Sequence, residues 1–461
     1  MNLIFEFIEN DINSAYNIVK AYNNSKINLE MKDKKIKNDE KFDYIKNNII
    51  SLKNHDFPAN MKNLENLKID ITNIHKIKTR LKKLKHIHIT NNALVITNIA
   101  NKNLLFRLNN IESLELNYEI HLHLSLIKFT NLKELKCSCC TTMKNEDIEN
   151  LINLESLFLS HNKNISDDAF KNLNKIKKLV LHKTKITSAV LQYLPDIQYW
   201  TPDRHVSNDN FENMKIIKKL KLLDLYHNKN ISDENIININ IEHIILSENH
   251  KITINGLNKN IKKIYLVGKV NIKDNDLKQL DLLSLNLVDN EIISDEGLKY
   301  CKNLKTLNLF CNCEITDKGL IEMKNLEYLN LKGLSHINNE ITDNSLKKLS
   351  KLKYLSLENN KNITDEGIKT LVNLEFLNIN HNKKITINGI LNLKNLREIN
   401  CMDSLLSEKD LYILVKNNTN LKIIHEFCNE DPKLPALYYS KKKYFVDDYD
   451  ESTCDIFEII W

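Results

Sequence analysis

Hydrophobic residues recur through most of the chain in one spacing, Leu-x-x-Leu-x-Leu, in which the intervening positions are mostly polar. Clear copies begin at Leu304, Leu326, Leu352 and Leu374, so their starts lie 22, 26 and 22 residues apart. Apolar and polar residues alternate within each copy, which indicates a short β-strand with one buried side. With weaker copies included, the frame occurs about seventeen times at a period typical of repeat proteins. The other copies begin at Leu64, Leu84, Ile111, Leu132, Leu154, Ile176, Ile197, Leu220, Ile241, Ile261, Leu282, Leu396 and Leu421.

Two polar motifs complete each unit. An Asn follows the strand at a fixed offset, at Asn162, Asn228, Asn249, Asn290, Asn312, Asn360 and Asn382. Its amide both donates and accepts, so we expect it to satisfy backbone groups where the chain turns away from the strand. Next comes Ile-Ser/Thr-Asp, as in Ile315-Thr316-Asp317. The Ser or Thr is expected to cap a short helix, and the acid suits the positive helix end.

A single unit of this kind cannot bury its own apolar side, so the units must stack. Ile315-Thr316-Asp317-Lys318-Gly319-Leu320 and Ile363-Thr364-Asp365-Glu366-Gly367-Ile368 resemble the leucine-rich-repeat family, in the variety with an Ile-Thr/Ser-Asp-x-Gly-Leu helix start found in many F-box substrate receptors. The resemblance covers roughly residues 60–425. It implies an α/β leucine-rich-repeat solenoid, with a curved parallel β-sheet on the concave face, short helices on the convex face and a small helical N-terminal cap. The expected domains are residues 1–60, 61–425 and 426–461.

The frame is disturbed in two places. The unit that begins at Ile197 has Trp200 and Pro202 where Leu is expected, and proline cannot donate to a sheet ladder, so this strand should be short or bent. The unit that begins at Leu326 carries extra residues around 333–339. These extra residues should form a longer loop. The insertion either marks the edge of a binding surface or reflects sequence drift in a loop that tolerates it.

Both ends of the chain depart from the repeat. We expect one or two helices over Leu3–Ala21, which either cap the solenoid or form a reduced F-box that docks a ligase adaptor. The F-box resemblance lacks the usual Leu-Pro opening, has Tyr22 where Trp is common, and rests on Ile4, Phe5, Ile8, Ile12, Val19 and Tyr22. At the other end Pro432 and Pro435 end the frame, and the apolar residues of the tail either cover the last repeat or serve as a linear docking motif.

Charge and composition restrict the function classes. Lys and Arg number 66 against 60 Asp and Glu, a net charge of +6 that is spread along the chain, which disfavours nucleic acid as a partner. The N-terminus lacks a signal-peptide pattern and no apolar run is long enough for a membrane helix, so no membrane association is expected. Nine irregularly spaced cysteines favour reduced thiols and a cytoplasmic location (host cytoplasm if the AT-rich codon bias is viral), with the nucleus as an alternative.

Catalytic and metal-binding patterns are missing from the sequence. Cys137, Cys139 and Cys140, and likewise Cys301, Cys311 and Cys313, lack companion ligands at zinc spacing and are interpreted as core or turn residues. Cys401-Met402-Asp403 resembles the Cys-x-Asp motif of a bacterial class of ubiquitin ligases, but Cys401 fills a buried strand position. His161, His182 and His227 would bind a metal only if their rings converge. We therefore expect no enzyme activity, no cofactor and no metal.

The polar positions between the buried leucines should face a partner. At the third position successive repeats carry Tyr328, Tyr354 and Phe376, and at the fifth Asn286, Asn308, Asn330, Asn378 and Asn400. A second expected cluster is Phe158, His161, His182, Tyr226, His227, Tyr265 and Phe310. Aromatic and amide side chains suit recognition of a protein surface. The sequence therefore predicts a protein–protein interaction module, foremost the substrate-recognition subunit of a cullin-type ubiquitin ligase, and alternatively a stand-alone scaffold or inhibitor.

Overall fold

The computed structural model places the chain in two compact units, Met1–Leu220 (unit 1) and Lys221–Trp461 (unit 2), and each is described here by itself. The structure describes the backbone of residues 4–9, 26–31 and 49–54, and residues 64–70, 83–90, 110–117, 126, 129–139, 141, 143–206, 217–333 and 340–424. The extra residues expected to loop out after Gly333 lie outside this part of the chain, as does the tail beyond Ile424.

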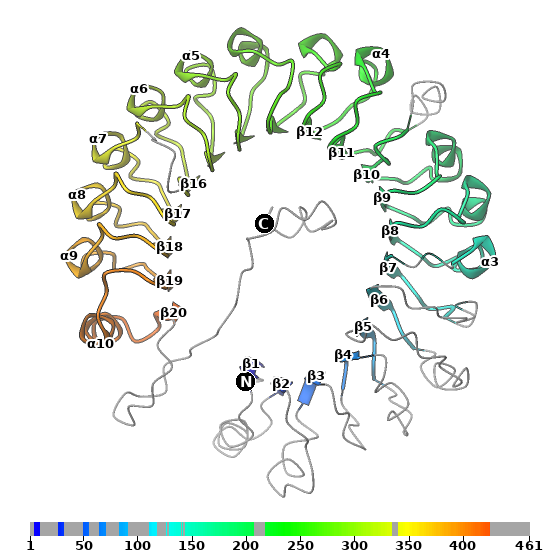
Figure 1. Ribbon diagram of the computed structural model, residues 1–461, viewed down its shortest axis with the longest axis horizontal. Coiled ribbons are helices and arrows are strands. Elements are labelled where there is room, and N and C mark those ends of the chain that lie inside the picture. Colours follow the sequence, from blue (N-terminus) through cyan, green and yellow to red (C-terminus); the bar gives the residue numbers. More distant parts are fainter. Residues whose placement is uncertain are drawn as a thin grey trace, which may run out of the picture. The chain divides into compact units, whose positions relative to one another are not determined.

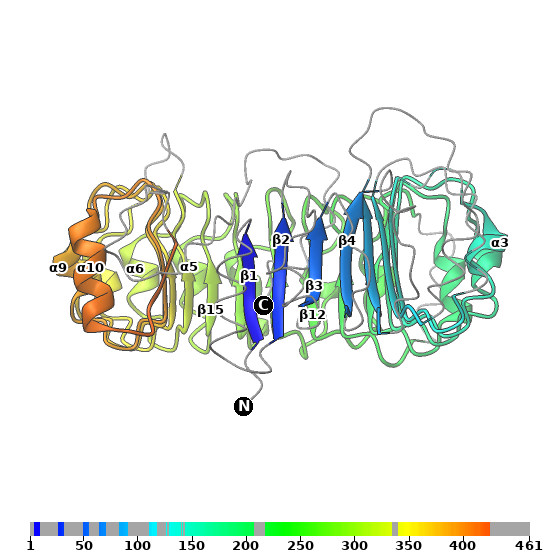
Figure 2. The same ribbon diagram turned by 90° about the horizontal axis from the view of Figure 1, so that it is seen from below.

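Unit 1 is a ladder of parallel strands in which each strand pairs with the next along the chain. The first four run side by side in the same direction (Figure 2). The strands are β1 (Ile4–Glu9), β2 (Lys26–Met31), β3 (Ile49–Asn54), β4 (Asn66–Asp70), β5 (His86–Thr90), β6 (Ser113–Asn117), β7 (Glu134–Ser138), β8 (Ser156–Ser160), β9 (Lys178–His182) and β10 (Tyr199–Thr201). Short helical turns on the opposite side are α3 (Asn145–Ile148), η4 (Asp167–Phe170) and η5 (Ser188–Tyr193).

Unit 2 repeats this arrangement, with its strands on the inner side and its short helices on the outer side of the unit (Figure 1). Its strands, again parallel and paired in chain order, are β11 (Leu222–Asp224), β12 (His243–Ile245), β13 (Lys263–Tyr265), β14 (Ser284–Asn286), β15 (Thr306–Asn308), β16 (Tyr328–Asn330), β17 (Tyr354–Ser356), β18 (Phe376–Asn378), β19 (Glu398–Asn400) and β20 (Lys422–Ile424). Its helices are α4 (Asp233–Ile236), η7 (Ile254–Gly256), η8 (Asp274–Gln279), α5 (Asp295–Leu298), α6 (Asp317–Leu320), α7 (Asp343–Leu346), α8 (Asp365–Ile368), α9 (Ile387–Ile390) and the longer α10 (Glu408–Asn417).

The secondary structure at the start of the chain differs from the predicted helix. Residues Ile4–Glu9, expected in a helix, form the strand β1, and Ile4 and Phe5 pair with Lys26 and Ile27 of β2. The physical reason is that the segment consists of isoleucine and phenylalanine apart from its two glutamates, and β-branched and aromatic residues favour a strand. The prediction of a helical cap is therefore wrong for Ile4–Glu9. The rest of Leu3–Ala21 lies outside the described residues, and the domain boundaries near residues 60 and 425 stay predictions.

The periodic leucines form the core, as predicted. In the repeat that begins at Leu326, the side chains of Leu326, Leu329 and Leu331 have no exposed surface, and the equivalent residues of neighbouring repeats are also buried. Burying a leucine or isoleucine side chain contributes about 1.5–3 kcal/mol. Stacking the repeats joins these side chains into one continuous core in each unit, so the pattern read from the sequence corresponds directly to burial.

A buried row of asparagines links each strand end to the preceding repeat. Oδ1 of Asn312 accepts the backbone N–H groups of Glu314 and Ile315, at 3.1 Å each. Its Nδ2 donates to the carbonyl oxygens of Leu287 and Asn290, at 3.1 and 2.9 Å. Asn382 makes the equivalent set of bonds. Asn249 accepts in the same way, but its Nδ2 donates to the carbonyl oxygens of Asn228 and Ile231. The predicted role of this asparagine is thus confirmed, and it also joins neighbouring repeats.

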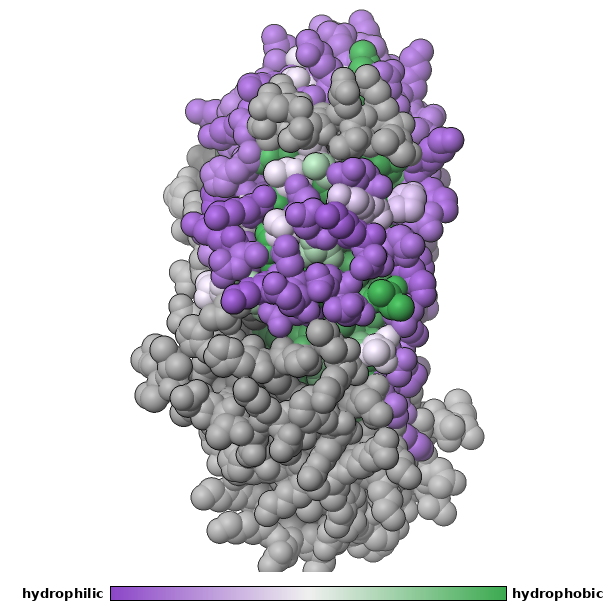
Figure 3. Space-filling model, turned by 90° about the vertical axis from the view of Figure 1, so that its right-hand side faces the viewer, coloured by the Kyte–Doolittle hydropathy of each residue, from purple (hydrophilic) through white to green (hydrophobic). Residues whose placement is uncertain are grey.

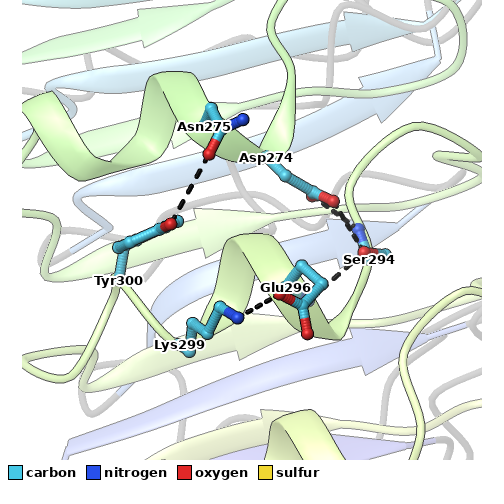
Figure 4. A network of polar contacts seen from close by, with 6 residues as sticks. All are labelled: Asp274, Asn275, Ser294, Glu296, Lys299 and Tyr300. Carbon is cyan, nitrogen blue, oxygen red and sulfur yellow. Dashed lines mark hydrogen bonds and ion pairs between the residues drawn. The ribbon is translucent and has the colours of Figure 1, made fainter.

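A second polar row runs along the helix starts. Oδ1 and Oδ2 of Asp274 accept the backbone N–H and the hydroxyl of Ser294, at 2.8 and 2.6 Å (Figure 4). The Ser294 hydroxyl in turn accepts the N–H of Glu296, which confirms the predicted N-cap. Gly297 lies against this carboxylate, where an added Cβ would overlap Oδ1 of Asp274. The acid expected to act only on its own helix therefore also binds the cap of the next repeat.

The strand disturbed by Trp200 and Pro202 keeps its place in the ladder. Strand β10 has three residues, and Trp200 pairs with Leu179 of β9 with its side chain fully buried. Pro202 follows the last strand residue, where a missing N–H costs no ladder bond. The expected short strand is confirmed, although the strands of unit 2 are equally short.

Candidate protein-binding surface

The side chains between the buried leucines form rows that cross the inner face of unit 2. Parallel pairing aligns Thr306, Tyr328, Tyr354, Phe376 and Glu398 in a first row. It aligns Asn286, Asn308, Asn330, Ser356, Asn378 and Asn400 in a second row. Successive strand residues point to opposite faces, so both rows lie opposite the leucine core, on the strand side of the unit (Figure 1). The predicted aromatic and amide positions therefore do share one face.

Three rings of the first row form an aromatic stack, Tyr328, Tyr354 and Phe376. The ring centroids of Tyr328 and Tyr354 lie 4.1 Å apart and those of Tyr354 and Phe376 lie 4.3 Å apart, with interplanar angles of 11° and 0°. All three are half-buried. Burial raises the pKa of the Tyr328 phenol, so it remains a neutral hydroxyl. Because neighbouring rings cover each other's faces, the ring edges and the hydroxyls are what a partner would contact.

Most amide oxygens of the asparagine row already accept hydrogen bonds from the backbone, which the sequence did not indicate. The Oδ1 atoms of Asn286, Asn308 and Asn330 each accept the backbone N–H two residues further on, at 3.0 to 3.1 Å. Asn378 does the same and also donates from Nδ2 to Oε2 of Glu358, at 3.1 Å. The oxygens of these four amides thus hold the strand ends in place. Contacts with a partner are left mainly to the amide nitrogens and the stack.

Charges beside the stack are paired. Nζ of Lys332 lies 2.8 Å from Oε1 of Glu358, with 19 % and 23 % of the two side chains exposed. The same ammonium lies 5.3 Å from the ring centroid of Phe310. At the far side of the stack, Nζ of Lys422 lies 3.1 Å from Oε2 of Glu398. The surroundings of the aromatic stack are therefore close to neutral.

The other residues of unit 2 that were predicted to bind a partner make contacts outside the aromatic stack. Tyr265 is only 9 % exposed and packs at 4.9 Å against the ring of His243, and burial raises its pKa far above its ordinary value. Tyr226 and His227 pack on each other with centroids 4.1 Å apart. Tyr265 therefore helps to build the face, whereas Phe310 lies beside the stack at the Lys332 contact.

The residues predicted for unit 1 lie together on β8 and β9. Phe158 is half-buried on β8, and the rings of His161 and His182, which follow or end their strands, lie edge to face at 5.3 Å. Sγ of Cys139 lies 3.7 Å from Nδ1 of His161. The structure does not bring three or more metal-ligating side chains together in a metal-binding group anywhere among the described residues. His227 belongs to unit 2.

Buried thiols are inert. Cys137, Cys301 and Cys401 are at most 2 % exposed, and burial raises the pKa of Cys301 and Cys401 to about 12. A thiol with this pKa is not a nucleophile at neutral pH. The interpretation of these three cysteines as core residues is confirmed, and Cys140 lies outside the described residues.

The predicted adaptor-docking residues are only partly described. Ile4, Phe5 and Ile8 lie in strand β1, not in a helix. Ile12, Val19 and Tyr22 lie outside the described residues.

The outer side of unit 1 offers a contrast with the inner face. Figure 3 shows mostly hydrophilic residues around α3 and its neighbouring turns, with hydrophobic residues in small separate patches. One exposed apolar residue in this region is Ile152, next to the loop that leads into β8. Scattered apolar residues of this kind are normal on protein surfaces.

A protein-family model described as "Leucine Rich repeat" matches residues 279–300, 300–324 and 348–372. The chain carries leucine-rich repeats. Together with the parallel ladder, this confirms the predicted leucine-rich-repeat fold class, and proteins of this kind are generally protein–protein interaction modules. No curated protein matches the sequence. Among the helices that the structure describes, none is both long and apolar enough to cross a bilayer.

Solved structures with similar folds include an internalin (inlF) of Listeria monocytogenes, with 24 % identity, 62 % of this chain and 83 % of that chain covered, and a TM-score of 0.42. A leucine-rich-repeat protein of Leptospira interrogans has 23 % identity, 86 % and 100 % coverage and a TM-score of 0.40. A complex of TLR13 with ssRNA13 has 16 % identity, 87 % and 58 % coverage and a TM-score of 0.48. Because all three TM-scores are below 0.5, no property of these proteins is transferred to this chain.

Proposed function

We propose that this leucine-rich-repeat protein binds another protein on the inner face of unit 2, with the aromatic stack at the centre of the contact. The observation that carries the proposal is the alignment of three half-buried rings on consecutive strands, on the side away from the leucine core. Aromatic residues are favoured in strands for packing alone. Here, however, all three rings are only half-buried, so a partner could cover their remaining surface, and aromatic residues are frequent binding hot spots.

Charge pairing defines the kind of partner that suits this face. The ion pairs of Lys332 with Glu358 and of Lys422 with Glu398 leave no strong net charge beside the stack. A partner surface rich in apolar and uncharged polar groups fits such a face better than a highly charged one. Binding should therefore depend only weakly on salt, because screening acts on unpaired charges.

The test is affinity purification from the organism's or host's cells with wild-type protein and with the Tyr354→Ser/Phe376→Ser variant. Partners of the stack should be captured by the wild-type chain and lost from the variant. The matched control is Tyr300→Ser, which removes a 40 % exposed ring just after α5 on the helix side. Equal loss in both variants, or retention in the stack variant, would show that the stack does not bind the partner.

A narrower proposal makes the chain the substrate-recognition subunit of a cullin-type ubiquitin ligase, which rests on the F-box resemblance near the N-terminus. The parallel pairing of β1 with β2 weighs against it, because Ile4, Phe5 and Ile8 were expected in a helical docking segment. A pull-down of the adaptor subunit that is lost in Phe5→Asp/Ile8→Asp would support the narrower proposal. Absence of adaptor binding would leave the stand-alone scaffold or inhibitor.

A further inference from the structure

The polar row along the helix starts is interrupted in unit 2 between η7 and η8. One step earlier, the carboxylate of Asp233 accepts the backbone N–H and the hydroxyl of Thr253, the N-cap of η7, at 2.7 and 2.6 Å. At the next step the place of the acid is taken by Ile254 and the place of the cap by Lys273, neither of which has a side-chain acceptor. The backbone N–H of Lys273 donates instead to Oδ2 of Asp276 in its own helix, at 2.7 Å. No acid-to-cap bond therefore joins η7 to η8, both of which the structure describes completely.

The third residue of each helix shows why η8 does not accept this bond. In unit 2, helices whose cap binds the acid of the preceding repeat have glycine or serine at the third position, as at Gly256 and Gly297. A Cβ at either glycine would lie 2.4 Å from Oδ1 of that acid. Helix η8 has Asp276 at this position, and its carboxylate caps its own helix. The interruption is therefore built into three positions, Ile254, Lys273 and Asp276.

The buried asparagine row is interrupted at the same junction. Asn249 and Asn290, in the flanking repeats, donate from Nδ2 to carbonyl oxygens of the repeat before, whereas the equivalent position between them holds the exposed Lys269. Within the continuously described residues 217–333, the Lys269 side chain donates to no carbonyl oxygen of the preceding repeat. Its backbone N–H donates to Oε1 of Glu248 at 3.1 Å, in a place open to water. Two separate rows of bonds thus fail to cross one junction.

The strand side of this junction is intact. Strands β12 and β13 pair in register, and the backbone N–H of Leu246 donates to the carbonyl oxygen of Tyr265 at 2.8 Å. The core also continues across it, because Ile244 and Ile264 have no exposed surface. On the outer side, η7 and η8 pack less closely than η8 and α5 do. The junction is therefore held by its strands and core, and it lacks the polar bonds that join other neighbouring helices.

We propose that the η7–η8 junction is a hinge, at which the outer sides of two neighbouring repeats separate while their strands stay paired. Each repeat of a solenoid contacts only its neighbours, so opening concentrates at the weakest interface. A hydrogen bond to a charged group changes an equilibrium constant by about ten-fold or more. Opening on the outer side changes the curvature of the inner face beside Tyr265. The aromatic stack lies on β16 to β18, where the acid-to-cap bonds are present, so the hinge does not depend on the proposed function.

A second junction with both interruptions lies near the end of the described ladder, between α9 and α10. There Ile387 and Ser404 occupy the acid and asparagine positions. The helix that follows, α10, has ten residues and a capping box between Ser407 and Asp410. Terminal repeats of solenoids are commonly atypical in this way. The junction before η8 differs, because repeats joined by both rows of bonds lie on either side of it, which makes the hinge internal.

Hydrogen–deuterium exchange of the full chain, followed by mass spectrometry, tests the hinge. Peptides that cover η7 and η8 should exchange about ten-fold faster than those that cover α5 and α6, whereas β12 and β13 should stay as protected as β14 and β15. The variant Ile254→Asp/Lys273→Thr/Asp276→Gly supplies the acid, the cap and the room between them. It should slow exchange in η7 and η8 by about ten-fold and leave α6 and α7 unchanged.

Two further variants serve as controls. Lys273→Thr/Asp276→Gly carries the same cap without the acid and should not slow exchange. Asp343→Ile copies the interruption at the α7–α8 junction, where Asp343 binds Thr364, and should accelerate exchange in α7 and α8 by about ten-fold. Thermal melts of all variants establish that they fold.

Three results would overturn the proposal. One is equal exchange of η7 and η8 and of α5 and α6 in the wild-type chain. Another is equal slowing by the control variant that lacks the acid. The third is loss of protection in β12 and β13 together with η7 and η8, which would indicate local unfolding of the whole repeat in place of a hinge.

Discussion

The carboxylate of Asp295, the first residue of α5, accepts two hydrogen bonds from Thr316, the N-cap of α6 in the following repeat. The Thr316 backbone N–H donates at 2.9 Å and its hydroxyl at 2.6 Å. Thr316 Oγ1 also accepts the N–H of Lys318, so the cap of one helix is fixed by the acid of the helix before it. Equivalent pairs, such as Asp343 with Thr364, occur along unit 2.

The variant Asp295→Ala should lower the free energy of unfolding by about 1–3 kcal/mol. It leaves the half-buried N–H and hydroxyl of Thr316 without their acceptor, and an unsatisfied polar group costs that much. Urea denaturation followed by circular dichroism measures the change. The control Asp281→Ala, at an exposed acid that binds Lys262 on the surface, should stay within about 0.5 kcal/mol. Equal effects would contradict the importance of the inter-repeat bond.

The variant Gly319→Ala should also destabilise unit 2, by about 1–3 kcal/mol, because the new Cβ would overlap Oδ1 and approach the backbone of Asp295. Combining it with Asp295→Ala removes the obstructing carboxylate. A double-mutant cycle by urea denaturation should therefore give a combined loss clearly smaller than the sum of the two single losses. Strict additivity would mean that the two residues do not compete for space.

The stability of the protein should fall as the pH drops from about 6.5 towards 4, in part through His243. Burial lowers the pKa of His243 to about 4, so the unfolded chain binds a proton below pH 6.5 that the folded chain rejects until about pH 4. Above pH 6.5 both states are neutral and the effect vanishes. Each pH unit inside this window costs about 1.4 kcal/mol.

The His243→Leu variant tests this pH dependence. Its unfolding free energy should fall less steeply between pH 6.5 and 4 than that of the wild type. Nε2 of His243 is buried without a hydrogen-bond partner, so its removal breaks no bond there. The exposed His250→Gln serves as the control and should keep the wild-type slope. Identical slopes in wild type and His243→Leu would rule out this histidine as the cause.

The variant Trp200→Ala should cost about 3–5 kcal/mol, because it empties the place of a fully buried indole. Trp200→Leu restores the residue type that the repeat expects and should cost less. Thermal unfolding of both variants gives the comparison. An equally mild effect of both would indicate that the core collapses around the missing ring.

The repeat pattern predicted those features that depend on one unit and its immediate neighbours. Burial of Leu329, the amide bonds of Asn312 and the cap at Thr316 all follow from periods and propensities within about 25 residues. The strand β1 was missed because Ile4–Glu9 was compared with a helical motif, although its isoleucine and phenylalanine residues favour a strand. The lysines of β7 and β9 that lie beside the Phe158 ring were missed because their proximity depends on register between strands, which aligns residues 22 and 20 positions away.

The bond from Asp274 to Ser294 has the same form as the bond from Asp295 to Thr316. Removing one whole repeat from the gene would therefore bring Asp274 against Thr316, and the two sides of the junction would still match. These repeats are therefore interchangeable, because each one offers a Ser or Thr cap to the repeat before it and an aspartate carboxylate to the repeat after it. A chain assembled in this way can shorten or lengthen by unequal recombination, and each event changes the side chains offered on the inner face while the scaffold persists.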